Sequence, residues 1–180
     1  MRFWNNKLLA NKNKISEIKN NWLNVTWDEV ATFIGPNAPV FKPVWEKQHT
    51  SWTEKGVGSF GFSWCWPALI PLLGIPWAAA RRLWPFVGMM VAVVVAINVM
   101  ALLWPNSSSF GFIIFFASAM AKPMYVQYAV AKVAQIKKQT SVGDARDAAL
   151  MEAGGLRMKY GYVAGGVCAA FLALLVVGSV

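Results

Sequence analysis

The sequence predicts an all-α integral membrane protein with three transmembrane helices, a Pro/Trp-rich re-entrant or kinked apolar segment, and a small helical N-terminal region. The first observation is Pro85–Trp104, a run of twenty residues without a formal charge. At a rise of about 1.5 Å per residue, such a helix reaches about 30 Å, the thickness of a bilayer's hydrocarbon core. Comparable runs follow at Phe110–Val130 and Tyr160–Val180. Composition agrees, because 57% of the residues are hydrophobic and only 14% are charged.

The chain is expected to divide at Ser59, with a polar cytoplasmic region over residues 1–58 and a membrane domain over residues 59–180. The predicted spans in that domain are 85–104, 110–130 and 159–180. Apolar residues recur at helical spacing within residues 1–24, which predicts an amphipathic helix. This helix would lie on a membrane surface or dock on a partner as a mobile arm.

Two short helices are expected in the rest of the N-terminal region. Thr26 is a suitable N-cap for a helix over Trp27–Ile34, and Glu29 completes a capping-box pattern. Gly35 and Pro36 then form a helix stop signal. The second short helix is predicted over Val40–Gln48.

The segment 60–80 is apolar over twenty-one residues but carries three prolines and two glycines. It is either a kinked span or a re-entrant hairpin that enters and leaves on one side, which is allowed where protein buries the irregular backbone. Charge favours the re-entrant form, because a crossing would place the basic N-terminal region outside the cell, against the positive-inside rule.

Basic residues set the expected topology. Arg81 and Arg82 precede the first span, and Lys137 and Lys138 follow the second, so both pairs mark cytoplasmic ends. The N-terminus is then cytoplasmic and the C-terminus exterior. Between the last two spans, Asp144–Met158 is expected to form a short helix that ends near Gly154 and Gly155.

Few polar residues interrupt the apolar runs. Lys122 either reaches the headgroups from the end of its helix or lines a polar pathway, and Asn98 either bonds a neighbouring helix or joins that pathway. Gly161 and Gly165 form a small-xxx-small pattern that predicts close helix packing.

Five of the ten tryptophans cluster at the proposed membrane boundaries and are expected to be interfacial anchors: Trp64, Trp66, Trp77, Trp84 and Trp104. The alternative is a stacking surface for lipid, quinone, carotenoid or a partner's helices.

The sequence contains no recognisable catalytic motif. The only histidine is His49, so the chain alone cannot supply two axial histidines to a haem. Zinc-ligand spacing, a phosphate-binding loop and a hydrolase elbow do not occur. We therefore expect no catalytic, cofactor-binding or metal-binding residues. The net charge of +9 is assigned to topology rather than to nucleic-acid binding.

Several motifs occur in a characteristic order: FIGPN at Phe33–Asn37, SFGFSWCW at Ser59–Trp66, WAAARRLW at Trp77–Trp84 and MYVQYAVAKV at Met124–Val133. Over about residues 28–138 the chain resembles an uncharacterised bacterial inner-membrane family, domain of unknown function 2628. It departs from that family at Ala80, where an aromatic residue is frequent, and before Tyr125, where the family's usual Asn is not found. The resemblance implies a bacterial cytoplasmic-membrane location and supplies no activity.

The functional expectation is a non-enzymatic accessory or scaffolding subunit of a larger membrane complex, with a photosynthetic or respiratory assembly as a host. Its partners would be other membrane protein subunits and lipids. The alternative is a homo-oligomeric channel or small-solute conduit, in which the segment 60–80 forms a pore element and Lys122 favours anions.

Overall fold

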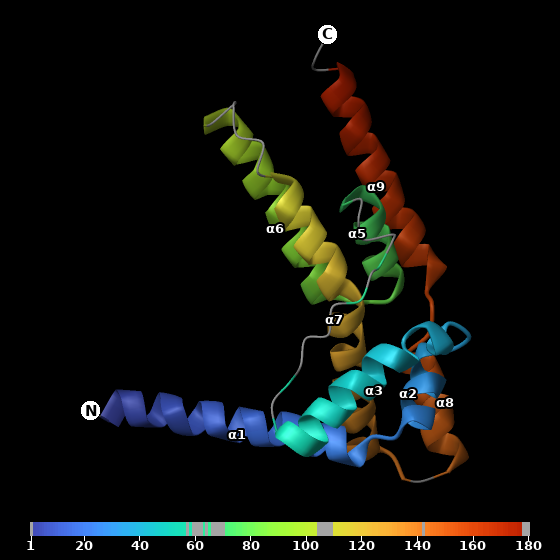
Figure 1. The fold of residues 1–180 in the computed structure, drawn as a ribbon. Coiled ribbons are helices and arrows are strands. Elements are labelled where there is room, and N and C mark those ends of the chain that lie inside the picture. The colour runs from blue at the N-terminus through green and yellow to red at the C-terminus, as the bar shows by residue number, and fades with distance from the viewer. Residues whose placement is uncertain are drawn as a thin grey trace. The chain divides into compact units, whose positions relative to one another are not determined.

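A computed structural model describes residues 2–56, 58, 63, 65, 71–103, 110–141 and 143–177, and every element in them is a helix (Figure 1). The chain forms two compact units. The first consists of Met1–Gly61 and Val126–Gly155, and the second of Phe62–Tyr125 and Leu156–Val180. Helix α7, Phe110–Gln139, contributes its first half to the second unit and its second half to the first.

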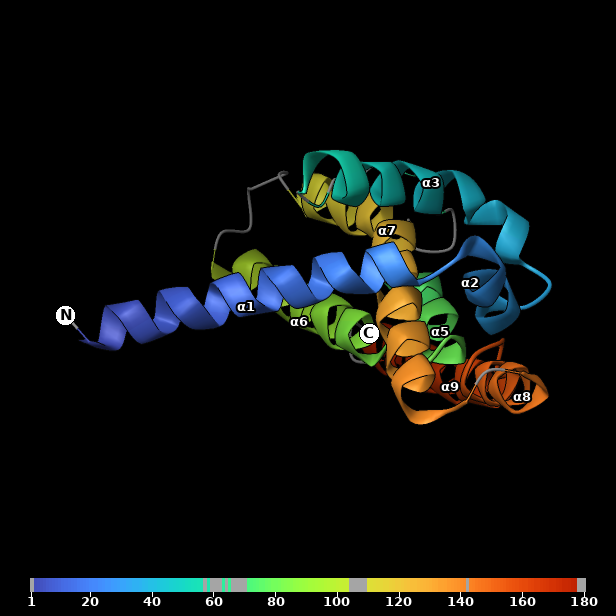
Figure 2. The same cartoon turned by 90° about the horizontal axis from the view of Figure 1, so that it is seen from below.

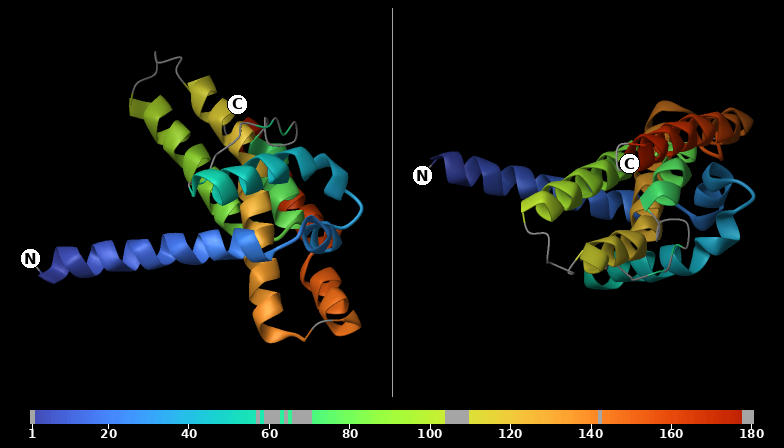
Figure 3. Two further views of the ribbon diagram at one scale, coloured as in Figure 1. Left: turned by 60° about the horizontal axis from the view of Figure 1, so that its bottom comes forward. Right: turned by 90° about the horizontal axis from the view of Figure 1, so that it is seen from above.

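The first unit begins with helix α1, Arg2–Asn24, whose N-terminal half extends away from the other helices of this unit (Figures 2 and 3). Helix α2, Trp27–Ile34, begins at Thr26, whose hydroxyl accepts a hydrogen bond from the Glu29 backbone N–H. The Glu29 carboxylate in turn accepts from the Thr26 backbone N–H at 2.9 Å. The predicted capping box is therefore confirmed.

The second short helix begins later than predicted. A 3₁₀ turn, η1, covers Ala38–Val40, and helix α3 covers Lys42–Thr50. Pro43 lies in the first turn of α3, where its missing N–H leaves no helical hydrogen bond unmade. A π-helical turn, η2, covers Ser51–Lys55, and helix α8, Asp144–Ala153, ends at Gly154 as expected from the sequence.

The core of the first unit joins segments that are distant in sequence. Phe33 of α2 meets Tyr128 of α7 edge-to-face, with ring centroids 6.4 Å apart. The large apolar side chains that are most completely buried here come from α1, α2, α7 and α8: Trp22, Val30, Phe33, Val126, Val130, Val133 and Leu150. Burial of each such side chain stabilises the fold by about 1.5–3 kcal/mol.

The second unit holds helix α5, Pro71–Ala80, between helix α6, Trp84–Leu103, and helix α9, Met158–Val177 (Figure 1). Ala78, Ala79 and Ala80 at the end of α5 are buried, because small side chains let the neighbouring helices approach closely. Helix α5 has ten residues, whereas α6 and α9 have twenty each. At about 1.5 Å per residue, α6 and α9 are therefore about twice as long as the helix between them.

The structure contradicts the membrane architecture expected from the sequence. Among the described residues, no helix combines the length and the apolarity that crossing a membrane requires. This finding overturns the three-span fold class over 85–104, 110–130 and 159–180, and with it the multi-pass inner-membrane location and the cytoplasmic N-terminus. The predicted span 110–130 lies in α7, which carries Lys122 within that run and Lys132, Lys137 and Lys138 after it.

The choice between a re-entrant and a spanning segment 60–80 falls largely outside the described residues. Its last ten residues form α5, with Pro76 inside the helix.

Candidate functional site

The second half of α6 is apolar and exposed. The helix Trp84–Leu103 contains no charged residue, and none of its described side chains from Val91 to Met100 is buried. Four side chains spaced four residues apart are between 47% and 63% exposed: Val91, Val95, Val99 and Leu103. We call these four residues the α6 face. The first half of the helix differs, since Phe86 and Met90 are fully buried.

Asn98 is the polar residue beside the α6 face. Its side-chain amide donates a hydrogen bond to the Val94 carbonyl oxygen of the same helix at 2.8 Å. The described contacts include no hydrogen bond or ion pair between Asn98 and Lys122, the two residues of the predicted polar pathway. This hydrogen bond uses one of the two N–H groups of the exposed Asn98 amide within its own helix.

Helix α9 packs on α5 through glycine. A Cβ atom at Gly161 would lie 3.1 Å from the Ala80 Cβ and 3.3 Å from the Pro76 carbonyl oxygen, and one at Gly165 would lie 3.8 Å from the Pro76 Cγ. The two glycines predicted for helix packing therefore face α5. On the same helix, Val163 and Val167 are exposed.

Arg81 and Arg82 form the turn between α5 and α6. The Leu83 N–H donates to the Ala78 carbonyl and the Arg82 N–H to the Ala79 carbonyl, both at 2.9 Å. This pair of bonds is a Schellman motif, in which the residue at the position of Arg82 adopts the left-handed conformation. Arg82 does so with φ 56°, although glycine is the usual residue there.

The two arginine side chains have different neighbours. The Arg81 guanidinium lies 4.5 Å from the Trp77 ring centroid and 5.8 Å from that of Tyr125, and it donates to the Trp77 carbonyl oxygen at 3.3 Å. Burial lowers the pKa of Arg81. The Arg82 guanidinium instead lies 5.8 Å from the ring centroid of Tyr160.

Further cations gather at the start of α9. The Lys159 ammonium is 5.1 Å from the Tyr160 ring centroid. The backbone N–H of Arg157 donates a hydrogen bond to the Ala80 carbonyl oxygen at 2.8 Å. Trp84 meets Tyr160 edge-to-face, with ring centroids 5.9 Å apart. We call Arg82, Arg157 and Lys159 the basic cluster. Cation–ring contacts of this kind hold a charge beside an aromatic face.

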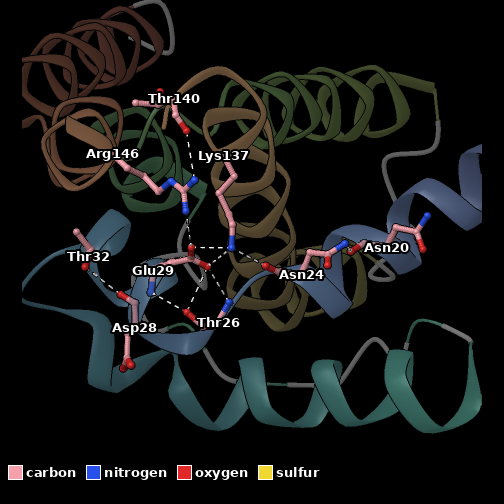
Figure 4. Close-up of polar contacts among 9 residues, drawn as sticks. All are labelled: Asn20, Asn24, Thr26, Asp28, Glu29, Thr32, Lys137, Thr140 and Arg146. Atoms are coloured by element: carbon pink, nitrogen blue, oxygen red, sulfur yellow. Dashed lines mark hydrogen bonds and ion pairs between the residues drawn. The ribbon is translucent and has the colours of Figure 1, made fainter. Parts of the chain in front are cut away.

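The first unit contains a charged network centred on Glu29 (Figure 4). The Glu29 Oε1 atom is 2.7 Å from the Lys137 Nζ and 3.7 Å from the Arg146 Nη1. Lys137 also donates to the Asn24 carbonyl at 2.6 Å, and Arg146 donates to the Thr140 carbonyl at 3.2 Å. The carboxylate thus joins α2 to α7 and α8.

Burial by itself would raise the pKa of Glu29. The hydrogen bonds from Lys137 and from the Thr26 backbone, together with the charge of Lys137, outweigh burial and hold this pKa below its usual value. Lys138 makes a more exposed ion pair with Glu17 at 3.5 Å. The two lysines predicted to mark topology therefore both have carboxylate partners.

The remaining predicted residues are only partly described. Of the predicted interfacial anchors, Trp77 lies beside Arg81 and Trp84 beside Tyr160, whereas Trp64, Trp66 and Trp104 lie outside the described residues. In the part of the chain that is described, no group of three or more His, Cys, Asp or Glu side chains is placed to hold a metal ion.

Sequence reasoning took the tryptophans as membrane anchors and the arginines as topology markers, and it missed that they contact one another. The four-residue spacing between Trp77 and Arg81 was a usable signal, because side chains at that spacing are neighbours on a helix. The contact of Arg82 with Tyr160 had no such signal, since Arg82 lies in the turn before α6 and Tyr160 in α9, far along the chain.

No known protein family, curated protein or solved structure matches this chain. The resemblance to domain of unknown function 2628 stays a prediction.

Proposed function

We propose that this chain is a non-enzymatic accessory subunit that binds another protein through the α6 face. The observation that carries the proposal is the exposure of Val91, Val95, Val99 and Leu103 along one uncharged helix. Contiguous exposed apolar patches on proteins commonly mark interaction surfaces. Completing the burial of four half-exposed aliphatic side chains would contribute about 3–6 kcal/mol, before the entropy cost of association.

The spacing of these residues favours a helical partner. Side chains four residues apart form a ridge, and such ridges pack into the grooves of another helix. One N–H of the Asn98 amide is bonded within its own helix, which lowers the cost of covering this polar group with a partner. The partner we expect is a helix with an apolar stripe of similar length.

The charged groups of the first unit support a structural role. Glu29 is bonded by Lys137, Arg146 and Thr26, so its carboxylate serves to hold helices together. Its lowered pKa keeps it ionised at neutral pH, which suits an ion pair better than proton transfer.

The test compares two full-length variants that each place one carboxylate on an exposed valine. Val95→Glu alters the α6 face, and Val40→Glu is the matched control, because both valines are 56% exposed. Tagged proteins at native expression levels are purified, and co-purifying chains are quantified by mass spectrometry. We expect a stoichiometric partner whose yield falls about tenfold with Val95→Glu and is retained with Val40→Glu.

Two results would refute this function. One is the absence of any stoichiometric partner of the unaltered protein. The other is an equal loss of the partner in both variants. Sedimentation of the purified chain is a third check, because a homodimer disrupted by Val95→Glu would show that a second copy, rather than another protein, covers the α6 face.

A further inference from the structure

Helix α1 carries a heptad repeat in its sequence. Leu8, Ile15 and Trp22 follow one another at intervals of seven residues. Taken as position a of a heptad abcdefg, they place three further residues at position d: Trp4, Asn11 and Ile18. Five of these six residues are apolar, and apolar a and d positions are typical of a helix that pairs with another in a coiled coil. We call these six residues the α1 seam.

The α1 seam is covered at its C-terminal end and becomes exposed toward its start. Trp22 is 2% exposed, Ile18 is half-buried and Ile15 is 51% exposed. The N-terminal half of α1 extends away from the other helices of the first unit (Figures 2 and 3). Seven of the 23 residues of α1 are Asn, which lowers the helix propensity, and most helices owe their stability to the packing of an apolar face. A further helix packed on the exposed part of the seam would therefore stabilise α1.

Lysine occupies the positions beside the α1 seam. Lys12 and Lys19 are at position e, and Lys7 and Lys14 are at position g. Lys12 and Lys14 are exposed, and no described hydrogen bond or ion pair uses either ammonium group. In a coiled coil, the e and g residues of one helix face those of the other and decide which helices pair. Lysines at these positions favour a partner that carries carboxylates there.

We propose that the α1 seam forms a coiled coil with a helix of another protein, one that has apolar residues at its own a and d positions and Glu or Asp at e and g. A second copy of this chain does not suit the seam, because two α1 helices would bring lysines against lysines. Asn11 adds selectivity, since a polar residue within an apolar seam fixes the register of the pair. The α6 face belongs to the other unit, so this proposal does not rest on the function proposed above.

The distribution of charge on α1 favours a protein helix over a nucleic acid. Away from the seam, the described b, c and f positions carry no lysine, and their one charged residue is Glu17, which pairs with Lys138 at 3.5 Å. A nucleic acid would need cations along this polar side to contact its phosphates.

The width of the apolar stripe favours one helix over a lipid surface. A strict a and d seam is narrow, whereas a helix that lies on lipid presents a broad apolar face. The seam also ends in a protein core at Trp22, which shows that its side chains pack against protein.

The experiment measures the binding of fluorescent peptides to the full-length protein by anisotropy. The first peptide has about four heptads with Leu at a and d and Glu at e and g, and the second has Lys in place of Glu. We expect the Glu peptide to bind at least about tenfold more tightly than the Lys peptide, because only its carboxylates complement Lys12 and Lys14. This comparison needs no variant of the protein.

Two variants test the seam and its flanks. Ile15→Asp should weaken binding of the Glu peptide about tenfold or more, and Leu23→Asp is the matched control, because both residues are 51% exposed but Leu23 is at position b. The double variant Lys12→Glu and Lys14→Glu should exchange the preference, so that the Lys peptide binds more tightly than the Glu peptide.

The matched control for the charge reversal is Lys47→Glu with Lys55→Glu, two exposed lysines of the same unit outside α1. It should change the affinity by less than about threefold and should leave the preference for the Glu peptide intact.

Several outcomes would overturn the proposal. One is no binding of the Glu peptide, and another is equal binding of both peptides. Equal losses with Ile15→Asp and Leu23→Asp would also overturn it. Tighter binding to phosphatidylglycerol vesicles or to a DNA duplex than to the Glu peptide, weakened by Lys12→Glu with Lys14→Glu, would assign the helix to lipid or nucleic acid instead. A homodimer disrupted by Ile15→Asp would show that a second copy covers the seam.

Discussion

Gly154 is the described glycine with the least room for a side chain, and Gly154→Ala is the most direct test of the packing in the first unit. A Cβ atom there would overlap the Phe33 carbonyl oxygen and lie 2.9 Å from the ring atom Cδ2 of Phe33. The backbone cannot yield cheaply, because the same carbonyl accepts a hydrogen bond from the Gly155 N–H at 2.7 Å. The end of α8 must therefore move away from α2.

The expected cost follows from the contacts that this movement breaks. Leaving the buried carbonyl of Phe33 without its partner costs about 1–3 kcal/mol. Overpacking against the Phe33 ring, which is 2% exposed, adds about 1–3 kcal/mol. We expect Gly154→Ala to lower the free energy of unfolding of the first unit by about 2–6 kcal/mol.

The assay is urea unfolding followed by circular dichroism, together with hydrogen exchange at the Gly155 amide. Gly88→Ala in α6 is the control, because a Cβ there meets no atom within 4 Å. It should leave stability unchanged or raise it by up to about 1 kcal/mol, since alanine favours the helix. A loss below about 1 kcal/mol in Gly154→Ala, with undiminished protection of the Gly155 amide, would show that the native α8 does not approach Phe33 as described.

Two further predictions concern single side chains. Glu29→Gln should cost the first unit about 1–3 kcal/mol, because the half-buried Lys137 loses its anionic partner, whereas Glu17→Gln at an exposed pair should change stability by less than about 0.5 kcal/mol. The folded-state pKa of Glu29 lies below the usual 4.5, so the stability that this carboxylate contributes is present above that pH and is lost as the pH falls through the folded-state pKa. Urea unfolding of the unaltered protein and of Glu29→Gln at several pH values measures this contribution. A difference in stability that did not shrink under acid would refute the assignment. Arg82→Gly should be about 0.5–1 kcal/mol more stable than Arg82→Gln, because both lose the charge but only glycine relieves the backbone, and thermal unfolding with equal midpoints would contradict the strain.

Local features of the fold were predictable from the sequence. The capping box links Thr26 to Glu29, only three residues away, and Gly35 provides the stop of the same helix. The end of α8 at Gly154 follows in the same way from a glycine at the C-cap. Each of these interactions is fixed by neighbouring residue types, so no knowledge of the tertiary fold is needed.

Contacts between distant residues were not predictable in this way. The ion pair of Glu29 and Lys137 spans 108 residues, and no pattern in the sequence connects the two positions. The basic residues were therefore interpreted by their place beside apolar runs. The same emphasis on runs of apolar letters led to three predicted membrane spans, which the described helices do not support.

Arg81 and Arg82 show why adjacent identical residues need not share a role. The Schellman turn places Arg82 in the left-handed conformation directly after the last helical residues of α5. The chain changes direction between the two residues, so Arg81 returns along α5 onto Trp77, while Arg82 reaches Tyr160 on α9.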